Sequence, residues 1–483
     1  MGVLDGIAPQ KVFAYFEKLC SIPHGSGNTK MISDYIAGFA KSRNYKYMQD
    51  NHNNIIIWAK GTKGYENADT VILQGHLDMV CEKEYGLDFD FEKDGLCLCL
   101  KNNLITANGT TLGGDDGIAV AYCLAILDSD DIPHPPLEIV LTSDEEIGML
   151  GAAAMDMSVL KGRILLNLDS EDEGYLLVSC AGGVTSKAVV PVNRKARTGI
   201  RLKLEIDGLL GGHSGVEIDK GRANANVLLG RILYAIAESF DIVIESVSGG
   251  LKDNAIPRSA NAVLVANPND FEKISQVVKA YAEIFSNEYR ATDSAVTIRI
   301  AECKNSIAFA PMDSDSTRKV IAGLVNLPCG IERMSFHIEG LVETSLNLGI
   351  LETNANSVMY SFAVRSSVES EKAALLDKIS CLTKMLGGHV QNTGAYPAWE
   401  YRKVSPLRDI CVSVFEKQYG KKPVIQAIHA GVECGLFAGK LKGLDAISFG
   451  PDMKDIHTSK ESMDIESVRR TWNFLLEILA SLK

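Results

Sequence analysis

Five residues with side chains that commonly bind metals lie where strands or helices are expected to begin or end. They are His76, Asp115, Glu146, Asp169 and His457. Four of them follow apolar runs that predict buried strands, at residues 71–73, 137–141, 164–168 and 446–449. Asp115 instead precedes the apolar helical stretch 118–127. Open α/β sheets place their ligand sites outside the carboxyl ends of the strands, so these positions predict one shared site.

Two imidazoles and three carboxylates suggest more than one metal ion. A catalytic zinc usually takes three protein ligands plus water, so five ligands are too many for one ion. They suit two ions about 3.5–4 Å apart if one carboxylate bridges. The mixed nitrogen and oxygen set favours Zn²⁺ and leaves Co²⁺ or Mn²⁺ open.

Two further acids stand next to these ligands. Asp78 lies two residues after His76 and is expected to orient its imidazole by accepting the second ring N–H. Glu145 directly precedes Glu146, so one glutamate can bind metal while Glu145 acts as a general base on a water molecule. Singly, each position has an ordinary structural interpretation: a strand-end histidine, a solvated acidic turn, or a helix cap. Their joint arrangement favours the metal site.

Several motifs resemble the dinuclear zinc exopeptidases related to carboxypeptidase G and carnosinase. Those around the predicted metal site are Gly-His-Leu-Asp at 75–78, Gly-Thr-Thr-Leu-Gly-Gly-Asp-Asp-Gly at 109–117, Asp-Glu-Glu-Ile-Gly at 144–148 and Asn-Leu-Asp-Ser at 167–170. Later motifs, at 211–215, 254–258, 342–347 and 428–436, narrow the resemblance to the bacterial aminoacyl-histidine dipeptidases. The likeness extends from about residue 21 to the C-terminal helix.

This resemblance implies a role for each matching metal position. His76 and Asp169 would bind one ion, Glu146 and His457 would bind the other, and Asp115 would bridge them. The loop before His457 is the loosest match, because residues 451–456 depart from the glycine-richer family form. Asp116 stands where relatives often have asparagine, and no function is assigned to it.

The resemblance also implies the remaining catalytic groups. Asp78 would be the orienting acid, Glu145 the general base, and His213 the group from a second domain that stabilises the tetrahedral oxyanion. The glycines around His213 suit a loop that approaches another surface closely. That domain would either close over the metals or reach across a homodimer, and the sequence leaves both open.

Four residues are candidates for substrate binding. Arg365, at the end of a predicted strand, is expected to pair with a substrate carboxylate, with a surface ion pair as the alternative. Asn254 is a candidate through its side-chain amide. His429 and Glu433 are four residues apart near the end of the strand predicted at 423–428. They would contact the amino end of the substrate or stabilise their loop, and both interpretations stay open.

Composition restricts the possible partners and the cellular location. Lys and Arg total 49 against 61 Asp and Glu, a net charge of −12, which argues against nucleic acids and anionic membranes. No apolar run approaches the ~18 residues of a membrane span. The first residues do not resemble a signal peptide. Eleven cysteines without CxxC pairs suggest reduced thiols and a cytoplasmic protein.

The order of expected elements predicts an α/β fold with an insertion. Strands and helices alternate at first, whereas strictly alternating runs such as 201–206 indicate half-exposed strands. We therefore expect a zinc-exopeptidase catalytic domain, a mixed sheet with helices on both faces, at 1–186 and 396–483. An α+β lid or dimerisation domain would be inserted at 187–395.

The predicted function is metal-dependent hydrolysis of dipeptides, with histidine preferred at the C-terminal position. The first alternative is a related amidohydrolase, either a deacylase or a carboxypeptidase acting on N-acyl amino acids. It would share the metal residues and differ around Arg365, His429 and Glu433. The second alternative is a non-catalytic binding protein, against which the intact Glu145 and the full ligand set argue.

Overall fold

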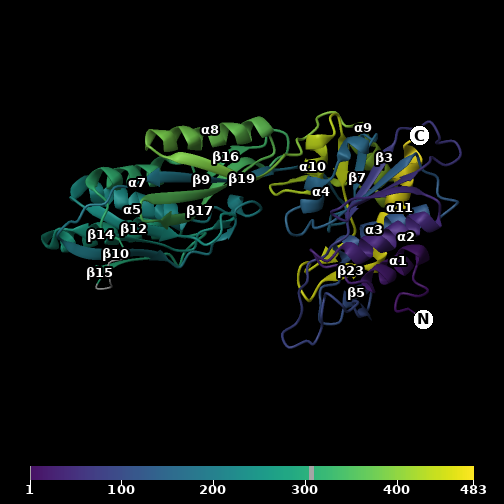
Figure 1. The fold of residues 1–483 in the computed structure, drawn as a ribbon, viewed down its shortest axis with the longest axis horizontal. Coiled ribbons are helices and arrows are strands. Elements are labelled where there is room, and N and C mark those ends of the chain that lie inside the picture. The colour runs from purple at the N-terminus through teal and green to yellow at the C-terminus, as the bar shows by residue number, and fades with distance from the viewer. Residues whose placement is uncertain (1, 304–308) are drawn as a thin grey trace. The chain divides into compact units, whose positions relative to one another are not determined.

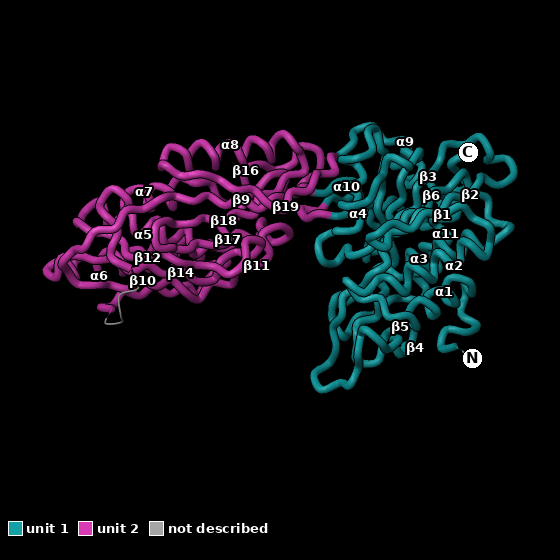
Figure 2. The backbone as a smooth tube through the Cα atoms, in the orientation of Figure 1, with its two compact units in different colours: residues 1–180, 401–427, 432–483 teal, residues 181–400, 428–431 magenta. Residues whose placement is uncertain are grey.

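The computed structural model describes residues 2–303 and 309–483, and these form two compact units. Unit 1 comprises residues 1–180, 401–427 and 432–483, and unit 2 comprises residues 181–400 and 428–431 (Figure 2). Each unit has its own sheet and its own core. The chain thus leaves the first unit, builds the second, and returns.

Unit 1 contains a mixed sheet whose central strands are parallel (Figure 1). Among the described residues its order is β1-β2-β6-β3-β7-β21-β8-β20. The parallel neighbours are β6, β3, β7 and β21, whereas β1 to β2, β2 to β6 and β21 to β8 are antiparallel. The bounds are β1 Lys46–Gln49, β2 Ile55–Ala59, β3 Val71–His76, β6 Leu137–Thr142, β7 Ile164–Asn167, β8 Tyr175–Cys180, β20 Val424–Ile428 and β21 Asp445–Ser448.

Continuous apolar runs form the middle of this sheet, as predicted for strands covered on both faces. Every residue of β3 and of β6 is buried. All residues of α3, Gly114–Leu127, are buried as well, and α3 packs against β3 and α1. The other helices of unit 1 are α1 Gln10–Cys20, α2 Lys30–Ser42, α4 Leu150–Ala154, α9 Pro406–Tyr419, α10 Glu433–Lys440 and α11 Ile465–Ser481.

Unit 1 also contains a small antiparallel sheet. Its order is β22-β23-β5-β4, with bounds β22 Met453–Lys454, β23 Ser462–Asp464, β5 Leu104–Ala107 and β4 Leu98–Lys101. Strand β5 leads into the loop before α3, and β22 and β23 flank the loop that carries His457. This sheet therefore ties together two loops that are about 350 residues apart in the sequence.

Unit 2 is an antiparallel sheet with helices packed on one face. The order is β15-β10-β14-β12-β17-β18-β9-β19, and β16 pairs with β17. The bounds are β9 Gly182–Pro191, β10 Ile200–Asp207, β12 Val243–Gly249, β14 Ala260–Ala266, β15 Thr297–Glu302, β16 Gly330–Met334, β17 Val342–Thr353, β18 Ser357–Ser366 and β19 His389–Tyr396. A short separate pair joins β11 Gly212–His213 to β13 Ala255–Ile256.

Alternation of apolar and polar residues explains why the helices cover only one face. Alternate residues of β18, such as Val358, Tyr360 and Phe362, enter a core shared with the helices. The helices are α5 Ala225–Ser239, α6 Phe271–Glu288, α7 Ser314–Asn326 and α8 Glu369–Met385. The strand at 201–206 was expected from the sequence, and β10 lies there.

The α/β fold class with an inserted α+β unit is confirmed. The structural division falls at 180/181 and 400/401, whereas the sequence placed it at 186/187 and 395/396. Residues 428–431 group with unit 2 and not with the flanking chain, because the Ala181 N–H lies 3.1 Å from both the Ile428 and Ala430 carbonyl oxygens. No helix among the described residues is long and apolar enough to span a bilayer.

Candidate metal centre

Three neighbouring parallel strands carry the predicted ligands to one edge of the unit 1 sheet. His76 is the last residue of β3, Glu146 follows the end of β6 by four residues, and Asp169 follows the end of β7 by two. Because β6, β3 and β7 are parallel and adjacent, their carboxyl ends meet at the same edge. The loop before α3 and the loop after β22 add Asp115 and His457.

Asp115 lies between the two imidazoles. Its Oδ1 is 3.0 Å from Nε2 of His76, and its Oδ2 is 3.1 Å from Nε2 of His457. On one side, Oδ1 of Asp169 is 3.7 Å from Nε2 of His76. On the other, Oε1 of Glu146 is 2.9 Å from Nε2 of His457. The five candidate ligands therefore form two groups that share one carboxylate.

These separations fit two metal ions. Ligand atoms about 2.0–2.1 Å from a tetrahedral Zn²⁺ lie about 3.3 Å from one another. The four distances between candidate ligand atoms given above, from 2.9 to 3.7 Å, lie on both sides of that value. A carboxylate with one oxygen in each group is the bridging arrangement that paired sites require. The donor set fits two divalent cations.

The charges in the chain alone point the same way. Burial opposes a charge on His76, but Asp169 and Asp115 hold its pKa well above its ordinary value. Hydrogen bonds to Asp115 and Glu146 raise the pKa of His457 to about 10. Each imidazole therefore holds a proton between carboxylates in the metal-free chain. A divalent ion would take the place of that proton and bring more positive charge.

The Asp115 loop is fixed by a distant carboxylate. Glu461 accepts backbone hydrogen bonds from Leu112 at 2.7 Å, Gly113 at 3.1 Å, Gly114 at 2.8 Å and Asp115 at 3.4 Å. Asp115 itself has non-helical dihedral angles, so the regular helix starts after it, as the sequence indicated. This contact between Glu461 and the Asp115 loop was not predicted from the sequence.

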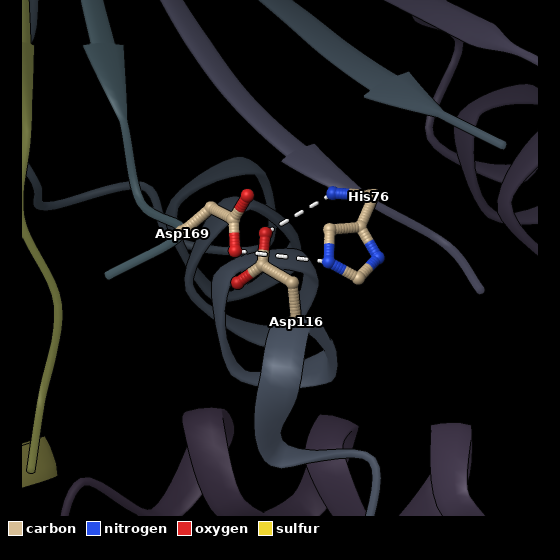
Figure 3. Close-up of side chains that lie close together, drawn as sticks. All are labelled: His76, Asp116 and Asp169. Carbon is tan, nitrogen blue, oxygen red and sulfur yellow. Dashed lines mark hydrogen bonds and ion pairs between the residues drawn. The ribbon is translucent and has the colours of Figure 1, made fainter. Parts of the chain in front are cut away.

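Asp116 belongs to the cluster although no function was assigned to it. Its Oδ2 accepts the His76 backbone N–H at 3.0 Å, and Figure 3 shows its side chain facing His76 and Asp169. The Asp116 side chain is fully buried, and burial followed by repulsion from Asp169 raises its pKa well above the ordinary value. The Asp116 side chain fits here because residue 75 is a glycine: a Cβ at Gly75 would lie 2.5 Å from Asp116 Oδ2.

Asp78 links the histidine ligand to the glutamate loop. Its backbone carbonyl lies 2.9 Å from Nδ1 of His76, whereas its Oδ1 is 3.6 Å from that nitrogen. The carboxylate accepts the backbone N–H groups of Glu145 at 2.9 Å and Glu146 at 3.3 Å. Asp78 therefore orients His76 mainly through its main chain and uses its side chain to hold the two glutamates.

Glu145 lies within this cluster without acting as one of the five candidate ligands. One of its oxygens is within 4.8 Å of ligand atoms of both His76 and Glu146. Burial, followed by repulsion from Asp169, Glu433 and Glu146, outweighs attraction by His76 and raises the Glu145 pKa to about 9. Cations bound at the neighbouring ligands would lower this pKa, so that Glu145 would be ionised and able to accept a proton as a general base.

His213 lies in unit 2, on β11. Its Nδ1 accepts the backbone N–H groups of Gly215 and Val216, both at 3.2 Å. The proton of the neutral ring is therefore on Nε2, which is left as a donor. Burial, followed by the charge of Arg365, lowers the His213 pKa, so the ring stays neutral near pH 7. This is the form that can donate to a developing oxyanion.

The predicted substrate-binding residues separate between the two units. Arg365 and His429 lie in unit 2 with His213. Burial, followed by the charges of Arg365 and His213, lowers the His429 pKa to about 3. Asn254 has an exposed side chain beside β13, and its carbonyl accepts the Ser214 N–H at 2.9 Å. Glu433, in contrast, is buried in unit 1.

Two buried nitrogens in this unit 2 cluster have no hydrogen-bond partner among the described residues. Nε of Arg365 is one, although its Nη1 donates to the Tyr396 hydroxyl at 2.9 Å. Nδ1 of His429 is the other, while its Nε2 lies 2.7 Å from the Ser345 hydroxyl. Unsatisfied buried donors next to a guanidinium favour an anionic ligand.

Known proteins resemble the chain over its whole length. Cytosol non-specific dipeptidase of Escherichia coli (strain K12) is 37% identical over 484 residues, covering 100% of this chain and 99% of that protein. The crystal structure of aminoacylhistidine dipeptidase from Vibrio alginolyticus matches with a TM-score of 0.94 and 35% identity, covering 99% of this chain and 98% of that chain.

More distant similarities place the two units in a wider family. Residues 204–293 match the peptidase dimerisation domain of the M20 peptidases. The aminopeptidase PepT structure from Bacillus cereus shares the fold, with a TM-score of 0.57 at 16% identity and 99% coverage of both chains. From its full-length identity to the Escherichia coli dipeptidase, the chain belongs to the M20 metallopeptidase family, in the branch of the cytosol non-specific and aminoacylhistidine dipeptidases.

Proposed function

We propose that this chain hydrolyses dipeptides with two divalent metal ions bound by the five candidate ligands. The observation that carries the proposal is Asp115, whose two oxygens face different imidazoles at 3.0 and 3.1 Å. The Escherichia coli and Vibrio alginolyticus relatives, which match the chain over nearly its full length, are dipeptidases, and this supports the same reaction here. Zn²⁺ suits the nitrogen and oxygen donors best, and Co²⁺ and Mn²⁺ are the alternatives.

The ions would supply Lewis acidity, which lowers the pKa of water and polarises the scissile carbonyl. Glu145 would take the proton of the attacking water and transfer it to the departing amine nitrogen. Asp78 holds the Glu145 backbone N–H at 2.9 Å and so fixes the position of this base. His213 would donate Nε2–H to the carbonyl oxygen as negative charge develops there.

The unit 2 cluster of Arg365 and His429 would bind the free carboxylate of the dipeptide. Arg365 can pair with a carboxylate, and Nδ1 of His429 is a second buried nitrogen without a partner among the described groups, which would donate in the tautomer protonated there. Asn254 would contact the substrate through its exposed side-chain amide. A preference for C-terminal histidine is proposed from the aminoacylhistidine dipeptidase relative.

The same relatives suggest a setting for the enzyme. The match to a peptidase dimerisation domain supports a homodimer, which sedimentation or light scattering of the purified protein would test. The name of the Escherichia coli relative supports a cytoplasmic location. The acidic charge of −12 favours neither nucleic acid nor an anionic membrane as a partner.

Hydrolysis of β-alanyl-histidine and of N-acetyl amino acids by the metal-loaded protein tests this proposal. A dipeptidase cleaves the first substrate and leaves the second largely intact. Preferential cleavage of the N-acetyl compounds would replace the proposal by a deacylase or carboxypeptidase. No hydrolysis across a panel of dipeptides and N-acyl amino acids, with two ions bound, would indicate a binding protein.

A further inference from the structure

Glu433 is a fully buried carboxylate with only one satisfied oxygen. It is the first residue of α10 and has 0% exposure. Its Oε2 accepts hydrogen bonds from the Gln74 side-chain amide and from the Thr142 hydroxyl, the latter at 2.7 Å. Its Oε1 is buried and has no hydrogen-bond partner among the described residues. A buried carboxylate oxygen without a donor is costly unless a ligand supplies one.

The two donors place Glu433 beside the metal centre. Thr142 is the direct neighbour of His76 in the parallel pairing of β6 with β3, so both side chains leave the same face of the sheet. Gln74 precedes His76 by two residues on β3 and points to that face as well. Burial, followed by repulsion from Asp169 and Asp78, raises the Glu433 pKa to about 8 against the attraction of His76, as expected for an acid close to these residues.

The donors also show that Glu433 acts as an acceptor. The side-chain amide of Asn167 donates to Oε1 of Gln74, so Nε2 of Gln74 must face Glu433. The described polar groups around Glu433 thus offer protons to Oε2 and leave Oε1 as a further acceptor. What completes the network is a donor.

The charge of that donor follows from the acidity of the surroundings. No described Lys, Arg or His forms an ion pair with Glu433. Carboxyl groups crowd the same centre: Asp78, Asp115, Asp116, Glu145, Glu146, Asp169 and Glu433. A cation bound at Oε1 would favour the ionised form of Glu433 and would offset the desolvation of its charge.

We infer that Oε1 of Glu433 binds the primary ammonium group at the amino end of the dipeptide. This rests on the proposed function and assigns Glu433 as the residue that makes the enzyme require a free amino terminus. An N-acylated peptide has no positive charge at that position and carries an extra acyl group. It would leave Oε1 unpaired, so it would be a poor substrate.

The competing role for Glu433 is structural, as a support for Gln74 and Thr142 behind His76. Substitution by glutamine separates the two roles, because a glutamine carbonyl can still accept from both donors but has no charge. A structural role would change all substrates alike. An ammonium-binding role would change only the substrates that carry a free amino group.

The test compares alanyl-histidine with N-acetyl-alanyl-histidine in the metal-loaded protein. Glu433→Gln is expected to lower kcat/KM for alanyl-histidine by roughly 10–100-fold, the worth of a hydrogen bond to a charged group, and to leave the N-acetyl compound within about 3-fold. Metal content should stay unchanged. An equal loss for both compounds, or no loss for either, overturns the inference.

Calorimetry supplies a readout that does not depend on turnover. In a Glu145→Gln background, Glu433→Gln should weaken binding of alanyl-histidine by the same factor. Glu138→Gln is the matched control, since Glu138 is also a buried acid on β6, 1% exposed, and accepts the Gly162 N–H at 3.0 Å. It should leave the ratio between the two compounds unchanged. If the wild-type protein hydrolyses no dipeptide, the proposed function fails as well, whereas hydrolysis with an unchanged ratio in Glu433→Gln rejects the inference alone.

Discussion

Replacement of Glu145 by glutamine removes the proposed general base and keeps the size of the side chain. The Glu145 loop is held through its backbone N–H, which lies 2.9 Å from Asp78 Oδ1, so the loop does not depend on the carboxylate. We therefore expect both metals to stay bound. Loss of general base catalysis should lower kcat by roughly 10²–10⁴-fold, or about 2.7–5.4 kcal/mol in activation free energy.

The assay is steady-state hydrolysis of alanyl-histidine together with metal analysis of the same sample. Glu146→Gln is the matched control, because Oε1 of Glu146 is 2.9 Å from Nε2 of His457 and belongs to the ligand set. That variant should lose metal as well as activity. If Glu145→Gln lost its metals while Glu146→Gln kept them, the roles of the two glutamates would have to be exchanged. Undiminished turnover in Glu145→Gln would refute the mechanism.

Three further outcomes follow from the contacts described above. His213→Ala should lower kcat by roughly 10²–10³-fold with unchanged metal content, and wild-type turnover would exclude it from the reaction. Gly75→Ala should cost about 1–3 kcal/mol in urea unfolding, because its Cβ would lie 2.5 Å from Asp116 Oδ2. Gly38→Ala, in α2 with nothing within 4 Å of the added Cβ, should stabilise by about 0.5–1 kcal/mol, and equal effects of the two changes would contradict the packing. Metal affinity, measured by competition with a chelator, should rise by up to about tenfold per pH unit, because His457 has a pKa of about 10 and must lose its proton to bind an ion. An affinity that does not depend on pH would disprove this.

The positions of the candidate ligands could be predicted because they depend on local sequence signals. The runs that became β3, β6 and β7 are mostly apolar, with Glu138 as the one charged residue within them, and each is followed by a residue that can bind metal. Parallel strands bring such residues to a common edge whatever the length of the connections. Taken alone, Asp115 could have been a simple helix cap, and only the presence of the other candidate ligands indicated that it binds metal.

The supports behind those ligands could not be predicted, because they come from residues far apart in the sequence. Glu461 holds the backbone of residues 112–115 across about 346 to 349 positions, and Glu433 reaches Gln74 across 359. Nothing in the local pattern around Glu461 distinguishes it from a solvated acid, and for Glu433 the sequence left open whether it contacts the substrate or stabilises its loop. Asp116 was in view beside Asp115, but its burial depends on the missing side chain of Gly75.

The division into units was predicted to within a few residues but not in detail. The pattern of apolar and polar residues changes gradually near residue 186, whereas the structure divides at 180/181. The segment 428–431 could not be assigned to unit 2 from the sequence, because long-range hydrogen bonds attach it there, to the Ala181 backbone and between His429 and Ser345. Apolar periodicity predicts an element well, but it does not show which unit a short connection joins.

Metal analysis of the purified protein, unsubstituted and with Asp115→Ala, tests the proposed centre most directly. Asp115 is the one carboxylate of the five candidate ligands that faces both imidazoles, at 3.0 and 3.1 Å. The unsubstituted chain should bind close to two divalent ions and hydrolyse dipeptides. Asp115→Ala should lose both metal and activity. A fully active Asp115→Ala protein, or an unsubstituted enzyme that is active with a single ion, would contradict the bridged two-metal centre.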